Sequence, residues 1–290
     1  SPDGLGGLVM SFAPLLPASG IAGFRLLAAT EATQRAVFER QPEIKRDVDY
    51  FAAKISEVRT AEDLVGDRRL MRVALGAFGL DEEIDKSAFM RKILAEGSEN
   101  PDAFANRLVD PRYKQMARAF GFGDTLGART ADAGFAGGVT EAYRERQFEI
   151  AVGEQNESLR LALNFRREIR VHATSADPAG AAWFSAMGDL PVRQVLEGAL
   201  GFPSGASQLD IDRQRDEFRD LGSKVFGSNS LAVFEDPEMV DKAITRFLAR
   251  RSLEEGPSPN TPGFAALTLL SAQSTGLGAL GLQNVVLSGG

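Results

Sequence analysis

The chain has 290 residues, a formal net charge of -7, a single histidine and no cysteine. The lack of cysteine excludes disulfides, thiolate nucleophiles and cysteine-based zinc sites, and the lone His172 excludes metal sites built on a histidine pair. The acidic balance argues against a nucleic-acid surface, and no apolar run reaches the roughly 20 residues that span a bilayer.

Residues 1–19 are expected to form a leader ahead of the folded part. Within it, the Gly-rich stretch 1–9 is interpreted as sequence left by cloning. The first thirty residues lack the basic start and the uninterrupted apolar core of a secretory signal, so no cleavable signal is expected.

Helical signals follow through residues 20–130, which are expected to form an N-terminal helical half. Thr60 to Asp63 resembles a capping box, and the next helix is expected to end at Gly79. The acidic stretch 81–85 predicts the start of a further helix that runs to Gly97. A helix that begins at Pro42 is predicted by an apolar stripe at alternating spacings of four and three residues. The stripe consists of Ile44, Val48, Phe51, Ile55 and Val58.

One pattern recurs along the chain, an aspartate followed by a helical stretch that ends in glycine. It covers residues 67–80, 110–122 and 189–202, and a weaker copy begins at Asp236. Each aspartate can accept hydrogen bonds from the first amides of a helix, and each glycine can adopt the left-handed conformation that ends one. The residues predicted as caps are Asp67, Asp110, Asp177, Asp236, Gly79, Gly121 and Gly201. The pattern predicts an all-α protein of irregular helical hairpin modules, packed into a bundle or array.

The Gly- and Ala-rich stretch 121–138 predicts a boundary between two halves, and residues 138–255 are expected to form the C-terminal helical half. A single long amphipathic helix is predicted over 140–171, and a further helix over 207–226. Residues 256–290 are interpreted as a Pro-rich linker and an apolar, almost uncharged tail.

The tail is the segment for which the sequence most favours partner binding. It is expected either to fold back onto the core or to dock on another protein, and both alternatives stay open. The candidate partner-binding residues are Phe264, Leu267, Leu269, Leu270, Leu277 and Leu280.

No catalytic, cofactor or metal site is predicted. His172 ends a basic helical segment and is explained by the helix dipole. The loop Gly121 to Gly127 fits neither a dinucleotide fingerprint nor a P-loop, and no strand precedes it. The alternating acids from Asp210 to Asp216 lack the glycine and the twelfth-position glutamate of a calcium loop.

The chain resembles DUF1217, a bacterial family whose members carry a domain of unknown function. The resemblance covers residues 10–273 and is carried most specifically by Asp67–Leu80 and Ala119–Asp124, each with an Ala-Phe-Gly motif. Further segments that carry it are Ser11–Leu15, Gly20–Leu27, Tyr50–Phe51, Thr60–Leu64 and Ala105–Tyr113. Genes of this family often lie beside those for flagellar basal-body and export components, so the resemblance implies a flagellar association.

We therefore expect a non-enzymatic protein, cytoplasmic or flagellum-associated, that acts through protein contacts in flagellar assembly or structure. Its partners are expected to be proteins, with no nucleic acid, no cofactor and no membrane span. The alternative is a cytoplasmic helical adaptor or export accessory, with a groove that binds a helix of another subunit. An enzyme with an unrecognised carboxylate site is the third hypothesis.

Overall fold

The structure is a computed structural model that describes residues 12–173 and 180–255. Over these residues it is all-α, with no strand, which confirms the predicted fold class. The α-helices are α1 (Gly20–Phe38), α2 (Pro42–Lys54), α3 (Ala61–Gly66), α4 (Arg68–Phe78), α5 (Ser87–Glu96), α6 (Pro111–Phe120), α7 (Phe135–Gly153), α8 (Glu157–Ala173), α9 (Ala181–Gly188), α10 (Leu190–Leu200), α11 (Ile211–Phe226) and α12 (Pro237–Glu255). Short 3-10 helices are η1 (Ile55–Glu57), η2 (Asp81–Glu83), η3 (Phe104–Arg107), η4 (Ser204–Gln208) and η5 (Leu231–Glu235).

Aspartates begin several of the helices, and glycines end several of them. The side chain of Asp67 accepts hydrogen bonds from the amides of Arg69 and Leu70 at the start of α4. Asp110 accepts from the amide of Arg112 at the start of α6, and Asp236 accepts from Glu238 in α12. Such a cap contributes about 1 kcal/mol. The glycines that end α4, α6 and α10 have left-handed backbone conformations, and they are Gly79, Gly121 and Gly201. Asp177 lies outside the described residues.

Three helix boundaries differ from the sequence-based expectations. The helix predicted over 140–171 is wrong as a single element, because the chain breaks between α7 and α8. Asn156 causes a new start there, since its Oδ1 accepts a hydrogen bond from the amide of Leu159 at 2.9 Å. Residues 81–83 form only a 3-10 turn, and α5 begins at Ser87. The helix predicted from Ser207 begins at Ile211, after η4.

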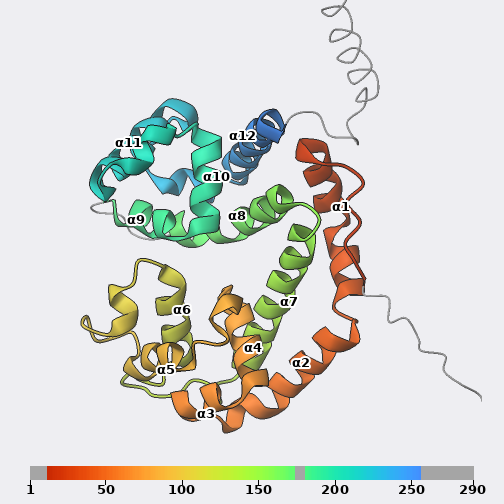
Figure 1. Ribbon diagram of the computed structural model, residues 1–290, viewed down its shortest axis with the longest axis vertical. Coiled ribbons are helices and arrows are strands. Elements are labelled where there is room, and N and C mark those ends of the chain that lie inside the picture. The colour runs from red at the N-terminus through yellow and green to blue at the C-terminus, as the bar shows by residue number, and fades with distance from the viewer. Residues whose placement is uncertain (1–11, 174–179, 256–290) are drawn as a thin grey trace, which may run out of the picture.

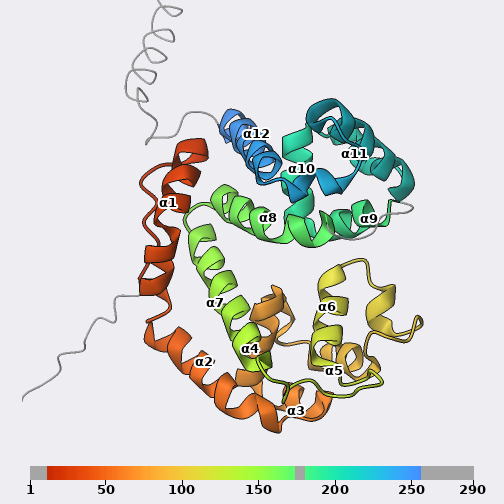
Figure 2. The same cartoon turned by 180° about the vertical axis from the view of Figure 1, so that it is seen from behind.

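The helices form two arms that are joined where α7 meets α8 (Figures 1 and 2). We call α2–α7 the N-terminal arm, in which α7 packs against α2 and α4. We call α8–α12 the C-terminal arm, in which α8 and α12 both pack against α10. Helix α1 contacts α7, α8 and α12 and so runs beside both arms.

Buried apolar side chains form one cluster that continues through both arms. Large fully buried members include Phe51 and Phe120 in the N-terminal arm, and Phe165 and Phe247 in the C-terminal arm. Because this core is continuous, apolar packing holds the two arms together at their junction. The residue boundaries predicted for the two halves, and the descent of the modules from a repeat, stay predictions.

Candidate functional site

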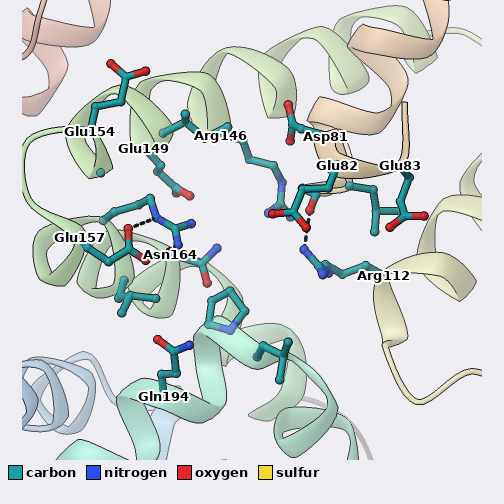
Figure 3. A pocket seen from close by; sticks show the side chains of 18 residues that line it. Asp81, Glu82, Glu83, Arg112, Arg146, Glu149, Glu154, Glu157, Asn164 and Gln194 are labelled. Carbon is teal, nitrogen blue, oxygen red and sulfur yellow. Dashed lines mark hydrogen bonds and ion pairs between the residues drawn. The ribbon is translucent and has the colours of Figure 1, made fainter. Parts of the chain in front are cut away.

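A polar cavity of about 600 Å³ lies at the junction of the two arms (Figure 3). The N-terminal arm supplies η2, Arg112 of α6 and the last turns of α7. The C-terminal arm supplies the first half of α8 and the start of α10. The break between α7 and α8 therefore creates this cavity, because it turns two consecutive helices toward the same space.

The three arginines that line the cavity are each held by partners. Arg112 donates from Nε and Nη2 to the carboxylate of Asp110, at 3.0 and 2.7 Å, and from Nη1 to the carbonyl oxygen of Gly79. Arg160 donates from Nε to Glu157 at 2.7 Å. Their charges are thus largely balanced within the protein, which leaves little excess positive potential for a free anion.

Arg146 belongs to a buried ion network that links the arms. Its Nη2 donates to Glu168 of α8 at 2.5 Å, and its Nε donates to the carbonyl oxygen of Ala77 in α4 at 2.8 Å. Arg167 contacts Glu168 as well and forms a two-pronged pair with Glu149 at 2.9 and 2.8 Å. Burial and the neighbouring Arg167 lower the pKa of Arg146. These contacts hold the angle between α7 and α8.

Beside Arg146, an apolar groove opens between the arms. It has a volume of about 460 Å³. Its charged end is lined by Arg146, Arg167 and Glu168 of the ion network and by the neighbouring Glu145. Exposed Val171 of α8 stands at its rim. Its apolar lining comes from α4, α6 and α7 and consists of Ala77, Phe78, Ala119, Phe135, Val139 and Ala142.

His172 has neighbours that the sequence analysis did not anticipate. Its Nδ1 lies 3.0 Å from Ser185 Oγ of α9, and its Nε2 lies 3.5 Å from Asp189 Oδ2, the cap of α10. A serine, a histidine and a carboxylate in this order form the set that hydrolases use. Here, however, His172 is only 1% exposed and Asp189 is 3% exposed, so a substrate has no access to them. The cluster joins α8 to α9 and α10, and His172 also lies in the last turn of α8, as the helix-dipole explanation requires.

Asp189 should make stability depend on pH. Burial opposes its ionisation, but the nearby His172 and the hydrogen bond from the amide of Val192 outweigh it and lower the pKa of Asp189 below its ordinary value. A group with a lowered pKa stabilises the fold above its unfolded-state pKa and loses that effect as the pH falls through its folded-state pKa. We expect Asp189→Asn to lower the free energy of unfolding by about 2 kcal/mol near neutral pH.

Urea unfolding of both proteins at several pH values checks this expectation. The difference in free energy of unfolding between the unmodified protein and Asp189→Asn should stay constant from neutral pH down to about pH 4. Below that pH it should shrink. A difference that is the same at all pH values would mean that the cap geometry, and not the charge, stabilises this cluster.

The other residues singled out from the sequence have structural roles or lie outside the described residues. Asp124, in the Gly121 to Gly127 loop, accepts hydrogen bonds from the amides of Ser98 and Glu99 at 2.6 and 3.1 Å, which ties this loop to the end of α5. Asp210 caps α11 by accepting from the amide of Arg213. The tail candidates all lie beyond residue 255, outside the described residues.

Metal and membrane features were searched within residues 12–173 and 180–255. In this part of the chain no group of three or more histidine, aspartate or glutamate side chains is arranged to hold a metal ion. Nor does any helix there combine the length and the apolar character that crossing a bilayer requires.

Comparisons with known proteins give one family and one similar solved structure. The family model described as "Protein of unknown function (DUF1217)" matches residues 77–240, more than half of the chain. The chain therefore belongs to the DUF1217 family. No curated protein matches it.

The fold is similar to the crystal structure of protein AGR_C_984 from Agrobacterium tumefaciens, determined by a structural genomics consortium. The two share 26% sequence identity with a TM-score of 0.68, and the match covers 85% of this chain and 100% of that one.

Proposed function

We propose that this protein is not an enzyme and acts through protein contacts in the assembly or structure of the bacterial flagellum. The flagellar setting rests on the resemblance to the family and its gene neighbourhood. The observation that supports a binding role is the apolar groove between the arms, with walls drawn from α4, α6, α7 and α8.

The shape and chemistry of the groove favour an amphipathic helix of a partner protein. Its floor combines small side chains, such as Ala119 and Ala142, with the rings of Phe78 and Phe135. Small residues let a helix approach closely, and the rings provide apolar area for its buried stripe. The polar face of such a helix would lie toward Glu145 and Arg167 at the charged end.

Two other functions remain as alternatives. A cytoplasmic adaptor or export accessory would use the same groove without joining the flagellar structure. An enzyme would require converging carboxylates that are free to exchange protons, whereas Glu149 and Glu157 in the cavity are paired with arginines, and Glu82, which has no arginine partner among the described residues, is exposed. This pairing favours a binding function over a catalytic one.

Site-specific crosslinking in the native cell tests the proposed function. A photoreactive amino acid replaces Val171 at the groove rim, and a control protein carries it at Leu253 of α12, another exposed aliphatic residue. We expect a flagellar component to be crosslinked from position 171 and not from position 253. The proposal would be contradicted if both positions crosslinked the same proteins, or if position 171 crosslinked only proteins that are not flagellar.

Fractionation separates the structural function from the accessory alternative. A structural component should copurify with isolated basal bodies after extraction with detergent. A protein that appears only in the cytoplasmic fraction, while still crosslinking to a flagellar component, would support the accessory function instead.

A further inference from the structure

A buried side-chain amide faces the polar cavity without a hydrogen-bond partner for its oxygen. Asn164 lies in the middle of α8 and is only 5% exposed. Its Oδ1 is buried and accepts no hydrogen bond from any residue that the structure describes. Figure 3 shows this side chain pointing into the space between Arg112 and Gln194.

A buried acceptor without a donor destabilises the protein while the cavity is empty. A buried oxygen that gives up its hydrogen bonds to water costs about 1–3 kcal/mol. Leucine would fill a similar volume without that cost, so the amide at this position indicates a polar occupant of the cavity. What the oxygen lacks is a donor.

The charges that line the cavity indicate a cationic donor. Six carboxylates and three guanidinium groups line it, and the guanidinium groups of Arg112, Arg146 and Arg160 are already paired with Asp110, Glu168 and Glu157. Glu82, by contrast, has no ion-pair partner within the described part of the chain. Its carboxylate is exposed and faces the cavity in Figure 3.

We propose that this cavity binds a guanidinium or primary ammonium group, which donates a hydrogen bond to Asn164 Oδ1 while Glu82 balances its charge. The inference is independent of the proposed function, because it concerns the cavity and not the apolar groove. Such a group can come from a small molecule or from an arginine side chain of another protein, and the chemistry that recognises it is the same.

Titration calorimetry on the full-length protein distinguishes the two sources. The probes are agmatine, a small molecule with both groups and no carboxylate, and a capped peptide with a single arginine. Binding of agmatine alone would assign the cavity to a small molecule, and tighter binding of the peptide would assign it to a protein side chain. Inorganic phosphate serves as the anionic control.

Three variants test which residues bind the probe. We expect Asn164→Leu and Glu82→Gln each to weaken binding by roughly tenfold or more. Glu43→Gln removes the same charge from an exposed position on α2 and should leave binding unchanged. The unliganded Asn164→Leu protein should unfold at the same or a higher urea concentration, a result that a purely structural amide would not produce.

Several results would overturn the proposal. If neither probe binds, water satisfies Asn164. If phosphate binds in place of the cations, the charge assignment is wrong. If Asn164→Leu does not fold, the amide is structural, and Glu82→Gln then decides on its own whether a cation is bound here.

Discussion

Replacing Glu168 by glutamine is expected to lower the free energy of unfolding by about 3–5 kcal/mol. Glu168 is buried and contacts both Arg146 and Arg167, so the variant leaves these guanidinium groups without their shared carboxylate. The loss should be large, because water cannot replace the missing charge in the interior. Urea unfolding followed by circular dichroism measures it.

An exposed ion pair provides the matched control. Lys45 and Asp49 form a 2.6 Å pair on α2, and their side chains are 65% and 61% exposed. Asp49→Asn should change the free energy of unfolding by no more than about 1 kcal/mol. Similar losses in Asp49→Asn and Glu168→Gln would show that the buried network contributes nothing beyond a surface pair.

The second large effect is expected for Phe120→Ala, at about 3–5 kcal/mol of lost stability. Phe120 is fully buried at the end of α6, and its ring centroid lies 5.6 Å from that of Phe122 and 5.1 Å from that of Phe135. Truncation would leave a cavity among rings that cannot all move inward. The loss of stability should appear as a lower midpoint of unfolding in urea.

Phe78 is the matched control, because it occupies the same place in the other Ala-Phe-Gly motif. It is only partly buried, and its ring centroid lies 6.3 Å from that of Phe120. Phe78→Ala should therefore cost about half as much as Phe120→Ala, since less apolar area leaves water at that position. Equal costs would mean that motif position, and not burial, determines the contribution.

The two phenylalanines show how far the sequence could predict this fold. Sequence spacing placed both at the end of a capped helix, where Gly79 and Gly121 have left-handed backbone conformations. Neither spacing nor composition distinguishes their burial, which depends on Phe135 and the start of α7 lying over α6. Local structure is predictable because a cap depends only on residues within one turn.

The candidate site was less predictable from the sequence. Asn156 separates α7 from α8, but the apolar period continues across it and favours one long helix, although Asn is a strong start signal. Arg146 and Glu168 are 22 residues apart, and Ala77 is 69 residues from Arg146. In a sequence with 33 basic and 40 acidic residues, many pairs of opposite charge are possible at such separations, so the sequence does not predict which pairs form.

By itself, the sequence determined the helical class and most helix starts and ends. These features follow from short-range chemistry, namely caps, glycine conformation and apolar period. Only the tertiary structure decided that Asn164 faces a cavity, that His172 lies beside Ser185 and Asp189, and that a groove opens beside Arg146. The reason is that each depends on the angle between α7 and α8, which packing between the arms sets and no local signal encodes.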